Sequence, residues 1–301
     1  MISNKPAVIV AAVVGLAAAW GGAVFGAGYR FEAPDVLDLS TVQPLLPLEQ
    51  GDPIAAVPLA ADIATAILAA PEVGNEAPGQ VPMLDGSDKV ARKQEQARIA
   101  AESTAVRRAG KTLTIDTGAA GPVKFSDHGS SSRDAADGEL FLYAGRIGAA
   151  SYHRVEERFL ADVPGSYLMN PASGRMVFAP NGSYVVQLSP DGRWLLSMSP
   201  GDTHVLLVVM ALAADGPGLA LVCRSATTNG ALAAFKGWYD ARSLDLVLTP
   251  LVLAPGKPGQ GAAALLPSEP IPVRLALDDQ GWHPQTPDPK ALERIGYTCR
   301  R

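Results

Sequence analysis

The chain of 301 residues has little charge and, in particular, little basic charge: 25 lysines and arginines stand against 30 aspartates and glutamates. The resulting net charge of -5 argues against a general nucleic-acid binder, which needs a basic surface. With 30 glycines and 25 prolines, the chain also has too few of both for a low-complexity or collagen-like protein. Because 48% of the residues are hydrophobic, wholesale disorder is excluded and a globular protein remains.

The sequence also lacks the motifs that carry common chemistry. It has no phosphate-binding loop, no Gly-x-Gly-x-x-Gly after a predicted strand, no zinc spacing and no calcium-binding loop, so we expect no cofactor and no metal. Asp127-His128, followed by Ser130–Ser132, supplies the residue types of a hydrolase triad without any supporting motif. This stretch predicts a solvated polar loop.

The N-terminus contains one long uncharged run, from Ala7 to Gly28. At about 1.5 Å per residue, a helix over this run just spans a hydrocarbon core of about 30 Å. Lys5 precedes the run and no lysine or arginine occurs from Phe31 to Asp88, so we expect the bulk of the chain to be exported. No cysteine lies near the run, which excludes a lipoprotein. The sequence therefore predicts a single-pass inner-membrane protein with a periplasmic C-terminal domain. A cleaved signal peptide, giving a secreted or periplasmic product, and a buried core helix are the alternatives.

Composition divides the chain into four parts: a signal-anchor over 1–30, an acidic proline-rich tether over 31–86, a spacer helix over 87–110 and a β-meander domain over 111–301. Dense prolines prevent long helices in the tether, apart from a short helical stretch from Leu59 to Ala70. The apolar residues of the tether need a surface, either on the chain's own domain or on another envelope protein. Ser87 as N-cap and Gly110 as C-terminal stop delimit a helix without a strong apolar stripe, which we expect to be solvated.

From Lys111 onward, short apolar runs alternate with turn residues, which predicts a mainly β fold with an antiparallel meander, either a partial propeller or sandwich-like. Asn181-Gly182 and Asp191-Gly192 are typical of tight hairpins. Charged residues on both faces of His153–Leu160 indicate cross-strand ion pairs rather than a metal site. The expected strands are Leu140–Tyr143, His153–Leu160, Tyr167–Asn170, Arg175–Phe178, Tyr184–Leu188, Trp194–Met198, Val205–Leu212, Leu219–Arg224, Leu244–Leu248 and Val273–Leu277.

The two cysteines are an even pair. An oxidising compartment would allow Cys223 and Cys299 to join and tie the C-terminal tail to a core strand. Two buried free thiols are the alternative.

One short motif has a catalytic interpretation. Thr114 to Ala119, Thr-Ile-Asp-Thr-Gly-Ala, resembles the hydrophobic-Asp-Thr-Gly-Ala signature of retropepsin-like aspartic proteases. The resemblance implies Asp116 as the catalytic carboxylate, with a second chain supplying its partner. Asp-Thr-Gly is also an ordinary turn after a strand.

A second resemblance concerns the fold. The segment Ser189 to Leu196, Ser-Pro-Asp-Gly-Arg-Trp-Leu-Leu, resembles the strand-turn-strand of TolB-type and WD-like propeller blades, and degenerate copies follow at Trp238–Leu244 and Asp278–Trp282. The run Leu140–Trp282, about half the chain, is similar to a group of exported bacterial proteins without an assigned activity. The shared residues are Tyr143, Gly145, Ile147, His153, Val155, Glu156, Tyr167 and Leu168, with the Ser-Pro-Asp-Gly turn. The resemblance implies blade-like repeats and no activity.

These observations predict an envelope-facing binding or scaffold protein without a catalytic site. The expected partner is another envelope or inner-membrane protein, and a homo-oligomer is compatible with the sequence. The alternatives are an anchored aspartic protease centred on Asp116 and a solute-binding propeller with a pocket lined by Trp194, Trp238 or Trp282.

Overall fold

The computed structural model of the chain describes residues 42–43, 52–73, 78–81, 84, 88–128, 139–159, 162–180, 185–200, 205–225, 231–253 and 265–301. These residues form four sheets of mainly antiparallel strands and three α-helices, which confirms the predicted β-rich fold. The predicted anchor over residues 1–30 lies outside the described residues. Within the described part of the chain, no helix is long and apolar enough to cross a membrane.

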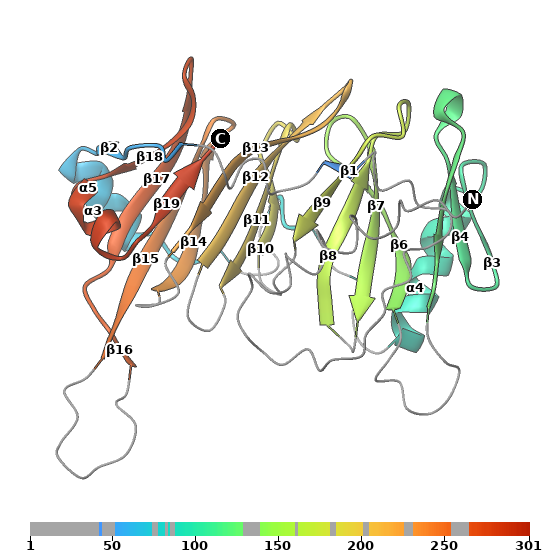
Figure 1. The fold of residues 1–301 in the computed structure, drawn as a ribbon, viewed down its shortest axis with the longest axis horizontal. Helices are drawn as coiled ribbons and strands as arrows, with labels where there is room; N and C mark the ends of the chain where they lie inside the picture. Colours follow the sequence, from blue (N-terminus) through green and yellow to red (C-terminus); the bar gives the residue numbers. More distant parts are fainter. Residues whose placement is uncertain are drawn as a thin grey trace, which may run out of the picture.

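The four sheets follow one another in a row along the longest axis of the molecule (Figure 1). The first sheet contains β3 (Val106–Ala109), β4 (Thr112–Asp116) and β5 (Pro122–Ser126). The second contains β6 (Glu139–Ile147), β7 (Tyr152–Phe159), β8 (Asp162–Met169) and β9 (Met176–Pro180). The third contains β10 (Val185–Leu188), β11 (Trp194–Pro200), β12 (Val205–Ala213), β13 (Gly216–Arg224) and the C-terminal β19 (Thr298–Arg300). The fourth contains β14 (Ala231–Asp240), β15 (Ser243–Leu253), β17 (Ile271–Asp278) and β18 (Gly281–Thr286), and the short β16 (Leu265–Pro267) pairs with the end of β15.

Three apolar layers join the sheets face to face. Because side chains alternate along a strand, each inner sheet has an apolar set on both faces. Members of the layers include Phe125 with Phe141 between the first and second sheets, Leu168 with Leu195 between the second and third, and Leu221 with Leu246 between the third and fourth. The row does not close into a ring, since the first and fourth sheets lie at opposite ends of the molecule (Figure 1).

We name the described residues from 42 to 84 the edge strap. Its first half follows the row along the last strand of the second, third and fourth sheets. β1 (Val42–Gln43) pairs in parallel with β9 of the second sheet. The Ile54 amide donates to the Cys299 carbonyl oxygen on β19 of the third sheet at 2.8 Å. β2 (Val57–Pro58) then pairs in parallel with β18 of the fourth sheet. This half of the strap therefore covers edges that would otherwise expose unpaired backbone groups.

The strap then turns back along the first strands of the sheets. α3 (Ala61–Ala69), within the predicted helical stretch, packs on the outer side of the fourth sheet. After it, the Val73 amide donates to the Phe235 carbonyl oxygen on β14, and the Val81 amide donates to the Val186 carbonyl oxygen on β10. The described part of the tether thus lies on the chain's own sheets.

The helix predicted over 87–110 is shorter, and the prediction of a solvated spacer is wrong. α4 (Asp88–Ala101) ends well before Gly110, because Val106–Ala109 pairs with β4 as a strand. α4 instead covers the free edge of β6. Glu95, which is fully buried, accepts a hydrogen bond from the Tyr143 amide at 2.9 Å, and Arg98 donates to the Ala144 carbonyl oxygen.

A ring of four charges fixes α4 and β3 to this edge. Arg92 and Arg108 each contact both Glu95 and Asp127, and Asp127 also accepts from the Phe141 amide at 3.0 Å. The ring is neutral, and its two carboxylates satisfy backbone amides of an edge strand. Asp127 is therefore part of a buried polar network, which corrects the predicted solvated loop for this residue.

The Ser-Pro-Asp-Gly turn joins β10 and β11, as predicted. Asp191 accepts from the Ser189 hydroxyl at 2.6 Å and from the Arg193 amide at 3.1 Å. Gly192 has φ +67°, and its carbonyl oxygen accepts from the Ala149 amide of the β6–β7 turn at 2.9 Å. A Cβ at Gly192 would lie 2.9 Å from that amide nitrogen, so the motif holds the turns of two neighbouring sheets together.

The other hairpin signals have different outcomes. Asp240, between β14 and β15, and Asp278, between β17 and β18, each accept a hydrogen bond from the amide two residues ahead, as Asp191 does. The predicted hairpin at Asn181-Gly182 is wrong, because the flanking strands β9 and β10 belong to different sheets. Residues 181–184 themselves lie outside the described residues.

Candidate binding site

Both outermost faces of the row contain polar side chains, and the fourth sheet also has apolar ones. On the first sheet, the residues that alternate with the buried Leu113, Ile115 and Phe125 are polar: Thr112, Thr114, Lys124 and Ser126. On the fourth sheet, the residues that point away from the third sheet are of both kinds: Leu232, Val247 and Leu251 are apolar, whereas Asp245, Thr249 and Arg274 are polar. α3 covers Val247, whereas Leu232 is 44% exposed. The fourth sheet thus combines polar side chains with an exposed apolar one on its outer side.

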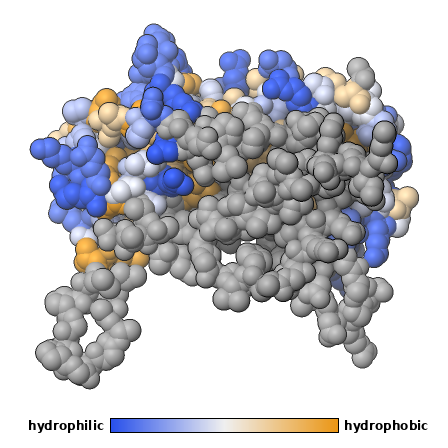
Figure 2. Space-filling view, viewed as in Figure 1, coloured by the Kyte–Doolittle hydropathy of each residue, from blue (hydrophilic) through white to orange (hydrophobic). Residues whose placement is uncertain are grey.

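Exposed large apolar side chains gather at the same end. Leu68 on α3, Leu232 on β14, Val252 on β15 and Leu266 on β16 are each 43–50% exposed. Among the described residues of this kind, only Val90 on α4 lies away from the fourth sheet and the strap that covers it. Figure 2 shows the orange apolar surface at the lower left, where β15 and β16 leave the sheet. We name Leu68, Leu232, Val252 and Leu266 the end face.

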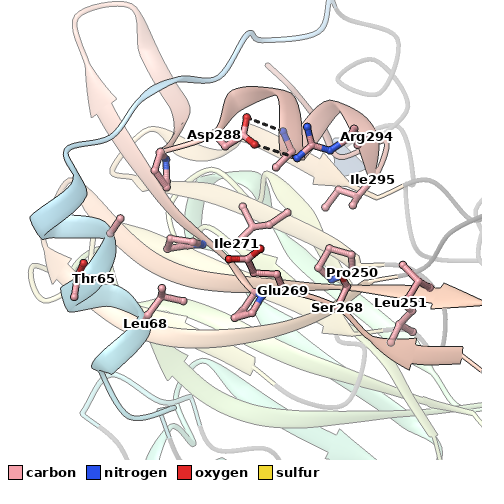
Figure 3. Close-up of a pocket in the computed structure, with 16 residues that line it drawn as sticks. Thr65, Leu68, Pro250, Leu251, Ser268, Glu269, Ile271, Asp288, Arg294 and Ile295 are labelled. Atoms are coloured by element: carbon pink, nitrogen blue, oxygen red, sulfur yellow. Dashed lines mark hydrogen bonds and ion pairs between the residues drawn. The ribbon is translucent and has the colours of Figure 1, made fainter. Parts of the chain in front are cut away.

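A pocket of about 720 Å³ opens within the end face (Figure 3). Three parts of the fold form its walls: α3, the region where β15 ends and β17 begins, and α5 (Pro289–Arg294). Most of the lining is apolar: Ala64, Leu68, Pro250, Leu251, Val252, Pro270, Ile271, Pro272, Pro287, Ala291 and Ile295. Pro250 and Pro272 lie at the ends of paired segments of β15 and β17, where each lacks a backbone N–H to donate.

The polar lining of the pocket includes Asp288, Arg294 and Glu269. Asp288 caps α5 by accepting from the Ala291 amide at 3.2 Å and pairs with Arg294 at 3.0 Å. The Arg294 hydrogen bond, chiefly, lowers the pKa of Asp288. Glu269 lies among the lining residues at the centre of the view, beside Ile271 and Ser268 (Figure 3). An apolar surface with charges of both signs can bind a protein surface, and among the described residues no group of three or more histidine, cysteine or acidic side chains is placed to hold a metal.

Asp116 occupies the start of the β4–β5 turn. Its Oδ1 accepts from the Gly118 amide at 3.0 Å, while the Thr117 hydroxyl donates to the Gly121 carbonyl oxygen at 2.6 Å. The Asp-Thr-Gly motif therefore forms the turn of a hairpin, the second of its two interpretations. The protease hypothesis stays a prediction that Asp116→Asn tests.

The structure brings the three tryptophans named for a solute site together. The rings of Trp194 and Trp282 lie 5.3 Å apart and those of Trp238 and Trp282 6.1 Å apart, both edge to face. Trp282 is fully buried, and the other two pack on the apolar layer between the third and fourth sheets. Their contacts are those of core residues.

The charged strand β7 is buried. Glu156 contacts Arg154 at 3.2 Å and Arg158 at 3.8 Å along the same strand. The predicted cross-strand ion pairs stay a prediction. Glu156 also accepts from the Leu84 amide at 2.9 Å, and Arg158 donates to the Leu84 carbonyl oxygen, which fixes the end of the edge strap. These charged side chains therefore hold the edge strap against the second sheet.

On the other face of β7, His153 is fully buried, and its Nδ1 lies 3.0 Å from the Tyr143 hydroxyl. Burial, followed by the charge of Arg146, lowers the pKa of His153 to about 4. The imidazole is therefore neutral at physiological pH.

A disulfide joins Cys223 on β13 to Cys299 on β19. The two residues face each other in the register of the third sheet. The bond ties the C-terminal strand to the sheet, next to the point where Ile54 of the edge strap pairs with Cys299.

The chain matches no protein-family model, no curated protein and no solved structure.

Sequence reasoning missed the pocket. Its walls come from α3, from α5 and from the segment 268–272, which lie far apart in the sequence. The available signals were indirect: Asp288-Pro289 is typical of a helix start, and Pro250, Pro270 and Pro272 mark strand ends. None of them shows that α3 would fold back onto the last sheet.

Proposed function

We propose that the protein is a membrane-anchored binding or scaffold protein of the cell envelope. The predicted helix over 7–28 is its anchor, and the β domain lies on the periplasmic side. The observation that carries the proposal is the end face, where apolar side chains and a pocket remain exposed at the last sheet of the row. Exposed apolar patches of this kind mark interaction sites in soluble domains.

We also propose that the second, third and fourth sheets are propeller-type blades in an open row. Each is an antiparallel meander of four consecutive main strands. The Ser-Pro-Asp-Gly turn at Asp191 and its echo at Asp240 occupy the first turn of two successive sheets. A blade-like repeat whose ring does not close leaves an end sheet available for a partner.

Photo-crosslinking in membranes tests the binding function. A photoreactive phenylalanine analogue is placed at Leu232 on the end face and, as a control of similar exposure, at Val90 on α4. The full chain is expressed, the membranes are washed with alkaline carbonate, and adducts are detected on gels. We expect the chain in the washed membranes and an adduct from position 232 alone. Loss of the chain in the wash would refute the anchor, and equal adducts from both positions, or none, would refute the end face as the binding surface.

A further inference from the structure

We infer that the pocket between α3, the β15–β17 region and α5 binds a small organic cation, which has an apolar body and an ammonium group with N–H donors. This inference rests on the proposed binding function and names the chemistry of one ligand. The pocket volume of about 720 Å³ lies within the range of small-molecule sites, about 300–1,000 Å³. Because most of the lining is apolar, the body of a matching ligand is apolar as well.

The charges of the lining favour a cation. Three charged side chains line the pocket: Glu269, Asp288 and Arg294. Asp288 is paired with Arg294 at 3.0 Å and also caps α5, so these two charges offset each other. Among the residues that the structure describes, Glu269 has no ion-pair partner, and Figure 3 shows it at the centre of the view. The pocket therefore has one negative charge in excess, on a carboxylate that is available to a ligand.

The hydrogen-bonding groups of the lining favour a ligand that donates. Four of the lining residues are prolines, which have no backbone N–H. The Thr65 hydroxyl donates to the Ala61 carbonyl oxygen at 2.8 Å. The Ser268 amide donates to the Pro250 carbonyl oxygen at 2.8 Å. These donors are therefore directed within the protein, whereas the ionised Glu269 carboxylate can only accept. An ammonium group matches this set of groups, and an anion does not.

Three probes with the same rigid apolar body test the ligand class: adamantylammonium, adamantanol and adamantanecarboxylate. The full chain is purified in mild detergent, and the dissociation constant of each probe is measured by saturation-transfer nuclear magnetic resonance. Adamantylammonium is expected to bind about 5-fold more tightly than adamantanol, the ratio that an exposed ion pair supports. Adamantanecarboxylate is expected to bind most weakly, because Glu269 repels it.

Two variants with the same substitution locate the cation. Glu269→Gln removes the charge of an exposed side chain and nearly keeps its shape, so we expect the fold to tolerate it. The matched control is Glu293→Gln, at an exposed glutamate of α5 that does not line the pocket. Glu269→Gln should lose the 5-fold preference for the cation and keep its affinity for adamantanol, whereas Glu293→Gln should keep the preference. A preference that survives Glu269→Gln, or tighter binding of the carboxylate than of the ammonium probe, would overturn the inference.

The photo-crosslinking experiment separates this inference from the proposed function. If no probe binds but position 232 gives an adduct, the small cation is refuted and the binding function is retained. If no probe binds and no adduct forms, both are refuted. A photoreactive residue at Val252, which lines the pocket, tests a different occupant. A protein adduct at this position that excess adamantylammonium abolishes would identify a basic side chain of a partner as the occupant, and would overturn the small ligand.

Discussion

Replacing Glu95 by glutamine is expected to lower the free energy of unfolding by about 2–3 kcal/mol. Glu95 is fully buried and accepts from the Tyr143 amide at 2.9 Å, from Arg108 at 2.7 Å and from Arg92 at 3.1 Å. Removing one partner of a buried ion pair destabilises proteins by about 3–5 kcal/mol. We expect the lower end here, because both arginines keep Asp127 and some contact with water, and glutamine keeps an acceptor for Tyr143.

The matched control is Glu102→Gln, just beyond the end of the same helix. Glu102 pairs with Arg146 at 2.9 Å, but both side chains are nearly one-third exposed. Exposed pairs contribute less than about 1 kcal/mol. Urea unfolding of the full chain in detergent, followed by tryptophan fluorescence and circular dichroism, measures both variants. Equal shifts of the midpoint would refute the assignment of α4 as the cover of the β6 edge.

Three further predictions concern pH, the disulfide and the motif turn. The pKa of His153 falls from 6.5 to about 4 on folding, so this residue's contribution to stability is full above pH 6.5 and declines by about 3 kcal/mol as the pH falls to 4. His153→Phe should flatten the plot of unfolding free energy against pH over this range. An unchanged slope would contradict the assignment of His153. Cys223→Ser with Cys299→Ser opens a link between residues 76 apart and should destabilise the chain by about 4 kcal/mol, seen as a lower melting temperature that reductant no longer changes. Gly192→Ala should destabilise by about 2 kcal/mol or more, and Gly110→Ala, also at positive φ but with open space around it, by about 1; melting curves in which both fall equally would remove the role given to the turn contact.

The sequence predicted the positions of strands and turns better than which segments pair and how the sheets are arranged. Period-two patterns and Asp-Gly turns are local, so the strands and the turn at Asp191 could be found without tertiary information. The sheet of β3–β5 and the end of α4 at Ala101 could not. Pairing of Val106 with Ile115 overrides the helix propensity of the Arg107-Arg108 stretch, and propensity is only a weak prior against such pairing.

The candidate site was beyond prediction for a related reason. Leu68 and Val252 each look like ordinary apolar residues of a helix and a strand. Whether these residues form an exposed binding surface depends on which sheet lies at the end of the row and on how much of that sheet α3 covers. Such information is non-local, and one sequence provides no direct signal for it.

The edge strap also sets the order in which the molecule can be completed. Its pairing partners on β9, β18 and β19 are synthesised long after it, and β19 is the last strand of the chain. High sequence separation between contacting segments slows folding, because the entropy of closing a long loop is lost before the contacts form. The edge of the third sheet at β13 therefore stays unpaired until Thr298–Arg300 are made, whereas β1 can pair with β9 as soon as β9 is made. During synthesis the edge of β13 is thus the one of these three that stays open longest, and a chain cut short before Thr298 cannot complete the third sheet.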